Sequence, residues 1–197
     1  MPVLLRIKHY QLIVTTMKKI CLIICLLMGH YANAQDYLTR NGNVSLFSHT
    51  SVEDIKGSNN EVVSLLNTTT GSIEFKIAIK SFHFPKQAME DHFNNSDYMN
   101  SEQYPKASFS GKITNLSAVN FTKDGAYDVT VEGNLTIKDV TKPVAAKGVI
   151  TVSNGKVIAQ ANFSVKRLDF HIVGESFMQK KIADEIQVTV NCQYDKR

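Results

Sequence analysis

The most constraining feature of this sequence is a period of two in the spacing of its apolar residues. Over residues 73–79, isoleucine or phenylalanine stands at every odd position, and the residues between them are polar or small. The same alternation recurs over 127–137, 157–165 and 186–194. Because successive side chains of a β-strand point to opposite faces, each segment predicts a strand with one apolar and one solvated face. Such strands are typical of antiparallel sheets.

Weaker segments of the same kind complete the pattern. They lie at 44–49, 61–66, 107–113 and 144–152, and a short extended piece is expected at 118–122. Asn154-Gly155 predicts a two-residue hairpin, because both residues tolerate a positive φ. Helical signal is confined to two short segments, 86–93 and 177–182. About eight one-faced antiparallel strands must hide their apolar faces, so the sequence predicts an all-β barrel or sandwich in one domain.

The N-terminal residues have the pattern of a secretory signal peptide. Lys18 and Lys19 precede an uninterrupted apolar run, Ile20–Met28, and Ala32-Asn33-Ala34 offers the small residues that a signal peptidase accepts. The run is too short to span a bilayer. We therefore expect a leader over 1–34, cleaved after Ala34, and a single domain over 35–197 that is periplasmic or secreted. Whether translation starts at Met1 or Met17 stays open.

Charge and cysteine content narrow the classes of partner. The formal net charge is +4, but four basic and no acidic residues precede position 35, which leaves 18 basic against 18 acidic residues. A neutral domain has no electrostatic reason to bind nucleic acid. No later segment is long and apolar enough for stable insertion in a membrane. Beyond the leader only Cys192 remains, which allows no internal disulfide and predicts a small buried strand residue.

No pattern of catalytic or metal-binding residues stands out. The four histidines of the domain, His49, His83, His92 and His171, have no second His or Cys at a metal-ligand spacing. The nucleophile motif Gly-x-Ser-x-Gly and phosphate-binding glycine loops are absent. Asp91-His92 could serve as a proton relay, whereas a histidine that covers a barrel mouth is the simpler interpretation. We expect no enzyme, no cofactor and no metal.

The interior of the predicted barrel is either filled or vacant, and periodicity alone leaves the two open. Small residues stand at positions whose side chains can point inward, and they either leave space in the interior or mark bends in the strands: Gly111, Gly133, Gly148, Ala159 and Ala161. If a cavity exists, its candidate wall is apolar and comes from the strands: Phe47, Phe75, Ile77, Phe109, Val129, Val131, Leu135, Ala161, Phe163 and Val188. The predicted helix then supplies the candidate mouth residues Met89, His92 and Phe93.

Two longer motifs make the sequence more specific. Residues 89–109 contain an Asp-His-Phe helix segment and then Tyr104-Pro105, with Phe109 four residues beyond that proline, and residues 133–143 read Gly-Asn-Leu-Thr-Ile-Lys-Asp-Val-Thr-Lys-Pro. In this order they resemble the YceI-like family of secreted bacterial lipocalin-like proteins. The resemblance implies an extended eight-stranded antiparallel barrel with an apolar channel for a polyisoprenoid or another long-chain lipid. The chain departs from the family where no aromatic residue follows Lys56-Gly57 and where the helix lacks an arginine.

These observations give a leading hypothesis and an alternative. The leading one is a non-catalytic, periplasmic or secreted protein that holds a long apolar ligand, such as a polyisoprenoid, inside the barrel. The alternative is a filled barrel that serves as a structural or protein-interaction module of the cell envelope, with a stress role implied only by the resemblance. The sequence leaves the oligomeric state open, including a dimer.

Overall fold

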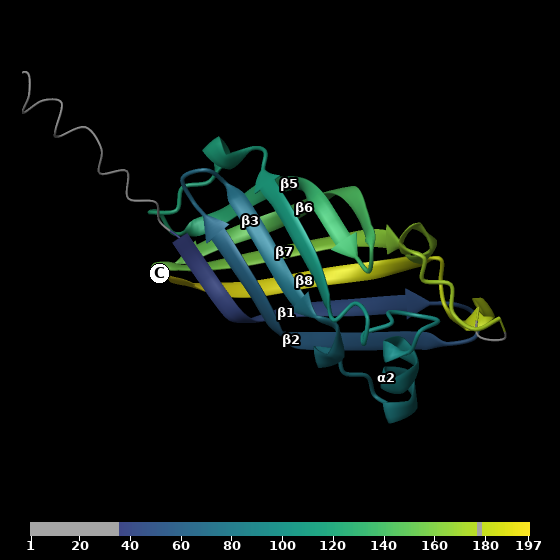
Figure 1. Ribbon diagram of the computed structural model, residues 1–197. Coiled ribbons are helices and arrows are strands. Elements are labelled where there is room, and N and C mark those ends of the chain that lie inside the picture. The colour runs from purple at the N-terminus through teal and green to yellow at the C-terminus, as the bar shows by residue number, and fades with distance from the viewer. Residues whose placement is uncertain (1–35, 177–178) are drawn as a thin grey trace, which may run out of the picture. The chain divides into compact units, whose positions relative to one another are not determined.

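The structure is a computed structural model that describes residues 36–176 and 179–197, and the predicted leader lies outside them. Eight antiparallel strands form a closed barrel in which each strand pairs with the next and β1 pairs with β8 (Figure 1). This confirms the predicted barrel. In chain order the strands are β1 (Asp36–His49), β2 (Asp54–Asn67), β3 (Ser72–Ala78), β4 (Lys106–Ile113), β5 (Gly125–Ile137), β6 (Val140–Ser153), β7 (Lys156–Lys166) and β8 (Glu185–Lys196).

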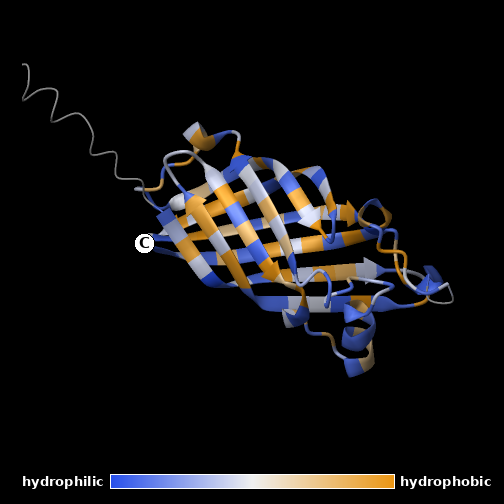
Figure 2. Cartoon of the chain, in the orientation of Figure 1, coloured by the Kyte–Doolittle hydropathy of each residue, from blue (hydrophilic) through white to orange (hydrophobic). Residues whose placement is uncertain are grey.

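The segments with the clearest alternation all form strands, and apolar and polar bands follow one another along them (Figure 2). Asn154 and Gly155 have φ values of 50° and 75° and join β6 to β7 as the predicted hairpin. The extended piece expected at 118–122 was wrong. A 3-10 turn, η2 (Leu116–Ala118), ends where this piece was expected to begin, and the side chain of Asn120 holds the following turn by accepting a hydrogen bond from the Thr122 amide.

One half of the barrel interior is filled with side chains. This filled half contains the end of the barrel where β1 begins and β8 ends, and inward residues from all eight strands meet in it. Its fully or nearly buried members are Tyr37, Leu66, Ile73, Ile113, Val129, Ile150, Val152, Val157, Cys192 and Tyr194. The Tyr194 hydroxyl lies 2.7 Å from Ser64 Oγ, and the Ser64 hydroxyl donates a hydrogen bond of 2.8 Å to the Glu74 carbonyl oxygen. The hydroxyl of Tyr194 on β8 is therefore hydrogen-bonded to β2, past the intervening strand β1.

The paired glycines of β4 and β5 do not leave a vacant space. Gly111 and Gly133 face each other across the two strands, and the ring of Phe109 lies over both. A Cβ atom added at Gly133 would lie 2.5 Å from Gly111 Cα and 2.6 Å from Phe109 Cζ. These glycines accommodate an aromatic ring of the protein itself, as in the aromatic cover of strand glycines known from other sheets.

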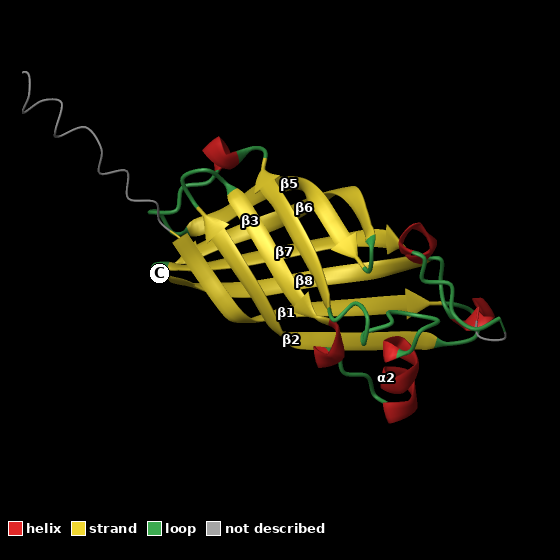
Figure 3. Cartoon of the chain, viewed as in Figure 1, coloured by secondary structure: helices red, strands yellow, loops and turns green. Residues whose placement is uncertain are grey.

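The opposite end of the barrel carries the longer connections (Figure 3). Between β3 and β4 the chain forms a 3-10 turn, η1 (Ile79–Ser81), and the helix α2 (Gln87–Asn94), which the sequence predicted at 86–93. Between β7 and β8 lie the 3-10 turns η3 (Arg167–Phe170) and η4 (Gln179–Lys181). Of the second helix expected at 177–182, residues 179–181 form the 3-10 turn η4, and residues 177–178 lie outside the described part of the chain. No helix among the described residues is long and apolar enough to cross a membrane.

The helix α2 lies where one wall of the barrel is incomplete. Only four residues of β2, from Val63 to Leu66, pair with β3. Nearer the α2 end, β2 still pairs with β1, but on its other side it makes one backbone bridge, between Ser58 and His83, whose amides and carbonyls exchange hydrogen bonds of 3.0 and 2.8 Å. The chain after β3 therefore continues the wall as a loop and a helix, and their side chains can face the interior.

Candidate functional site: an apolar cavity in one half of the barrel

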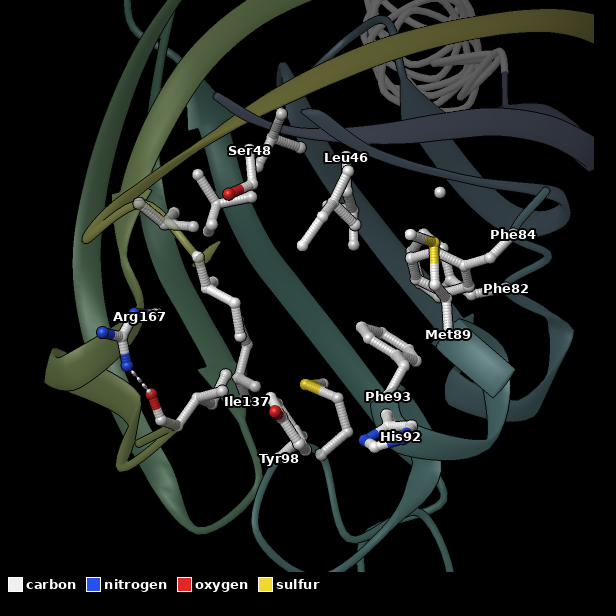
Figure 4. Close-up of a pocket in the computed structure, with 18 of the residues that line it drawn as sticks. Leu46, Ser48, Phe82, Phe84, Met89, His92, Phe93, Tyr98, Ile137 and Arg167 are labelled. Atoms are coloured by element: carbon white, nitrogen blue, oxygen red, sulfur yellow. Dashed lines mark hydrogen bonds between the residues drawn. The ribbon is translucent and has the colours of Figure 1, made fainter. Parts of the chain in front are cut away.

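The half of the barrel next to α2 encloses a cavity of about 360 Å³ (Figure 4). This hollow half contains the ends of β1, β5 and β7 and the beginnings of β2, β4 and β8. The volume lies in the range of small-molecule sites in proteins. Its wall is largely apolar and includes Leu46, Ile55, Ile79, Phe82, Phe84, Met89, Phe93, Met99, Ala107, Leu135, Ile137, Phe163, Val165, Phe170, Ile172, Ile182, Ile186 and Val188.

Three phenylalanines from the loop and helix after β3 form an aromatic side of the cavity. The rings of Phe82 and Phe84 lie 5.3 and 5.0 Å from the ring of Phe93, centroid to centroid. Phe84 also covers Gly57 of β2, where an added Cβ atom would lie 2.7 Å from the ring. Because β2 lacks a side chain at this point, the ring can lie directly on the strand and close the gap left by β3.

The helix α2 turns one face toward the cavity. Ala88, Met89, His92 and Phe93 line it, as expected for positions one and four residues apart on a helix. Glu90, on the adjoining face, accepts a hydrogen bond of 3.3 Å from the Phe84 amide. This contact links the helix to the aromatic loop and orients the face that lines the cavity.

A buried arginine lines the cavity, and its guanidinium group donates its hydrogen bonds to other residues of the protein. Arg167 is 6% exposed and donates to the carbonyl oxygens of Ala183, Ile172 and Val173 and to the carboxylate of Asp184. A buried charge needs such partners, and here they join the chain on either side of η4. The role visible in the structure is therefore to hold the connection between β7 and β8 against the barrel.

Two further polar residues, Tyr98 and His92, belong to the cavity wall, but the Tyr98 hydroxyl and His92 Nδ1 are themselves buried and have no surface open to the cavity. Tyr98 is 7% exposed; burial raises the pKa of its hydroxyl, and a weak hydrogen bond from the Glu175 backbone opposes that rise. The two rings meet edge to face with centroids 6.3 Å apart. The pair therefore contributes ring surface to the wall, and its polar atoms point into the protein.

Comparison with known families identifies the barrel. The model of the YceI-like domain matches residues 38–194, which is almost all of the described chain. The chain belongs to the YceI-like family. No curated protein sequence matches it.

Solved structures share the fold of this YceI-like protein at low sequence identity. A polyisoprenoid-binding domain from Saccharophagus degradans, implicated in plant cell wall breakdown, aligns with a TM-score of 0.72 at 11% identity and covers 83% of this chain and 99% of that one. BcnA of Burkholderia cenocepacia has a TM-score of 0.65 at 19% identity, over 78% and 96% of the chains. The YceI protein of Campylobacter jejuni has a TM-score of 0.58 at 19% identity, over 76% and 88%.

The YceI-like barrel divides the residues predicted for the cavity into three groups. The first group lines the cavity: Leu135, Phe163, Val188, Met89, His92 and Phe93. The second group lies on inward strand positions but outside the cavity wall: Phe75, Ile77, Phe109, Val129, Val131 and Ala161. Phe47 alone is on the outer face, where its ring stacks on His49 and lies 5.4 Å from Lys56 Nζ.

The reason for the misplaced residues is the division of the interior. Phe75, Phe109, Val129 and Val131 pack against the cluster of the filled half. Alternation places these side chains inside, but it does not say at which level along the strand the interior stops being filled. Phe47 fails for a simpler reason: Leu46 and Ser48 face the cavity, so the residue between them must face out.

The prediction also missed the cavity residues that come from loops. Phe82, Phe84, Tyr98, Met99, Arg167, Phe170 and Ile172 all lie between strands and outside any periodic segment. The alternating Phe82 and Phe84 directly after β3, and the Tyr98-Met99 pair in an otherwise polar stretch, were the available signals.

Proposed function

We propose that this protein is a non-catalytic binding protein that holds the apolar chain of a lipid, such as a polyisoprenoid, in the hollow half of its barrel. The observation that carries the proposal is the cavity itself, which is about 360 Å³ in volume and walled mainly by aliphatic and aromatic side chains. Membership of the YceI-like family, and the fold shared with a domain described as polyisoprenoid-binding, support the same class of ligand.

The energy available from such a wall is sufficient without specific polar contacts. Each methylene removed from water contributes about 0.8 kcal/mol, so ten of them contribute about 8 kcal/mol before the cost of ordering the chain. The flexible side chains of Met89 and Met99 also suit a wall that must fit ligands of varied outline. A carrier of this kind needs no reacting groups.

The proposal includes secretion of the protein to the periplasm or beyond. It rests on the basic, apolar and small-residue order of residues 17–34. Cell fractionation followed by N-terminal sequencing of the protein from its own host tests this part. The expected product is extracytoplasmic and begins at Gln35, whereas a cytoplasmic product with an intact N-terminus would contradict it.

Lipid analysis of the native protein tests the binding function. The protein is purified from its own host without detergent, weighed by native mass spectrometry, and then extracted with organic solvent. We expect an added mass that disappears on extraction and a long-chain lipid in the extract. Absence of any bound lipid, together with no uptake of a fluorescent acyl or prenyl probe, would favour the filled-barrel interaction module instead.

A matched pair of variants locates the binding site. Leu46 faces the cavity and its neighbour Phe47 faces out, so Leu46→Trp and Phe47→Trp place the same bulk on opposite faces of β1. We expect Leu46→Trp to lower probe affinity at least tenfold and Phe47→Trp to leave it unchanged. Equal affinities for both variants would place the probe outside the barrel.

A further inference from the structure

We propose that one layer of side chains beneath the cavity, centred on Phe109, limits the length of the lipid tail that the barrel accepts. This boundary layer consists of the first inward residues below the cavity, among them Phe75, Phe109 and Val190, which pack against the cluster of the filled half. The inference rests on the proposed lipid-binding function and adds a selectivity for tail length. A tail longer than the hollow half leaves its remaining carbons outside the protein.

On three neighbouring strands the cavity ends at the same level. The last residue that lines it and the next inward residue are, strand by strand, Phe163 and Ala161 on β7, Val188 and Val190 on β8, and Leu46 and Val44 on β1. The three lining residues are paired directly across these strands, and so are the three residues below them. Because strand pairing fixes the relative height of these side chains, the boundary is a continuous layer and not a single contact.

Phe75 and Phe109 complete the boundary layer on β3 and β4. The two residues are paired directly, and their rings meet edge to face with centroids 6.2 Å apart. Neither lines the cavity, whereas Ala107, the inward residue before Phe109 on β4, does. Phe75 packs both against the cluster of the filled half and against a second buried cluster that contains Val44 and Val188. The two rings therefore occupy the interior directly below the cavity.

Phe109 is the residue of this layer whose removal opens the deepest space. Its ring lies where two side chains are missing, because the neighbouring inward residues of β4 and β5 are Gly111 and Gly133. The next inward side chain on β4 is that of Ile113, about 13 Å further along the strand at about 3.3 Å per residue. Without the ring, a groove runs from the cavity toward Ile113. The glycine pair thus makes the depth of the cavity depend on one aromatic ring.

A series of ligands with one head and tails of increasing length tests the length limit. N-alkyl dansyl amides, from hexyl to eicosyl, are titrated against delipidated protein below the concentrations at which they aggregate, and fluorescence gives their affinities. In the unsubstituted protein, each added methylene should raise the affinity about fourfold until the tail reaches the boundary layer, and further methylenes should add nothing.

Phe109→Ala should move this break to longer tails. We expect it to raise the affinity of the eicosyl amide at least tenfold, because several more methylenes leave water, and to leave the affinity of the hexyl amide unchanged. A merely structural role of Phe109 would instead lower the affinity of every tail alike. If Phe109→Ala does not fold, Phe109→Leu replaces it and should move the break in the same direction by fewer methylenes.

Phe47→Ala is the matched control, because it removes the same ring from the outer face of β1 and should leave the break in place. If no dansyl amide binds the unsubstituted protein, the lipid-binding function itself fails. If the affinity rises without a break up to the eicosyl tail, or the break stays in place when Phe109 is replaced, binding stands and the length limit is overturned. A break that moves as far in Phe47→Ala would overturn the assignment to Phe109 as well.

Discussion

The two halves of the barrel share most strands and the same alternation, yet one is filled and the other is hollow. In the filled half, inward side chains from all eight strands meet, and Tyr194 of β8 reaches past β1 to Ser64 of β2. In the hollow half, β3 has ended and the wall is completed by the chain around α2 and by the connection between β7 and β8. Where regular strands close the barrel, their inward side chains fill the interior. Where loop segments complete the wall, their side chains line the cavity without filling it.

The two buried tyrosines show the same contrast in polar chemistry. Tyr194 in the filled half is fully buried and hydrogen-bonded, and burial raises the pKa of its hydroxyl. Tyr98 in the hollow half is nearly as buried, and its hydroxyl is bonded weakly by the Glu175 backbone in the connection between β7 and β8. Regular strands therefore hold the first hydroxyl, and irregular connections hold the second.

The largest expected difference between the halves comes from two substitutions on the same face of β5. Gly133→Leu in the filled half would collide with the backbone of Gly111 and the ring of Phe109, and should cost about 3 kcal/mol or more or prevent folding. Leu135→Phe lines the cavity and should cost less than about 1.5 kcal/mol while lowering probe affinity. Urea denaturation measures both, and equal losses would contradict the division of the interior.

Truncation should also distinguish the halves. Ile113 is 1% exposed in the filled half, so Ile113→Ala should cost about 3 kcal/mol by removing buried contacts and leaving a new void. Leu46 borders a space that already exists and has fewer contacts to lose, so Leu46→Ala should cost about 1 kcal/mol. Chemical denaturation of delipidated protein compares the two, and a larger loss for Leu46→Ala would show that the cavity is closed in solution.

Removal of each tyrosine hydroxyl gives a smaller but more specific contrast. Tyr194→Phe leaves Ser64 without one of its two partners and should lower the free energy of unfolding by about 1 kcal/mol. Tyr98→Phe removes a hydroxyl whose bond from the Glu175 backbone is long or poorly aligned, and should lower the free energy of unfolding by less than about 0.5 kcal/mol. Thermal unfolding of the delipidated variants measures the difference. An equal or larger loss for Tyr98→Phe would contradict this order.

A pH-dependent loss of stability at alkaline pH is also expected to originate in the filled half. Burial raises the pKa of Cys192 from 9.0 to about 12. Between these values the unfolded chain has released the thiol proton and the native chain has kept it, so stability present below pH 9 falls as pH rises. Denaturation midpoints from pH 8 to pH 11 test this, and Cys192→Ala should flatten the decline. An unchanged slope in that variant would assign it to other groups, among them Tyr194.

Much of the fold could be predicted because its signal is local. Strands such as β5 and β7 alternate so regularly that the faces of their residues follow from position alone, and Asn154-Gly155 marks its hairpin by backbone preference. The loop around residues 118–122 could not be predicted in this way. There, side chains such as Asn115, which bonds the backbone of Asp128 and Thr130, compete with strand formation.

The site was only partly predictable. Leu135, Phe163 and Val188 were found because they lie on alternating strands and happen to fall in the hollow half. Phe109 was misplaced because its ring turns onto Gly111 and Gly133, which is a contact between strands that no single segment reveals. Tyr98 and Arg167 were missed because they come from irregular connections, where no period indicates which side chain faces inward.

The sequence by itself determined the strands, most of their inner and outer faces and their antiparallel arrangement, because these follow from a repeat between neighbouring residues; the closed barrel followed from the resemblance to the YceI-like family and not from the repeat. Only the tertiary structure decided where the interior is filled, which loops complete the wall beyond β3, and where the polar atoms of those loops find their partners. Those properties depend on the side-chain volume and the hydrogen-bonding groups that distant segments together bring to the same place. A local sequence pattern carries no information about this combined contribution.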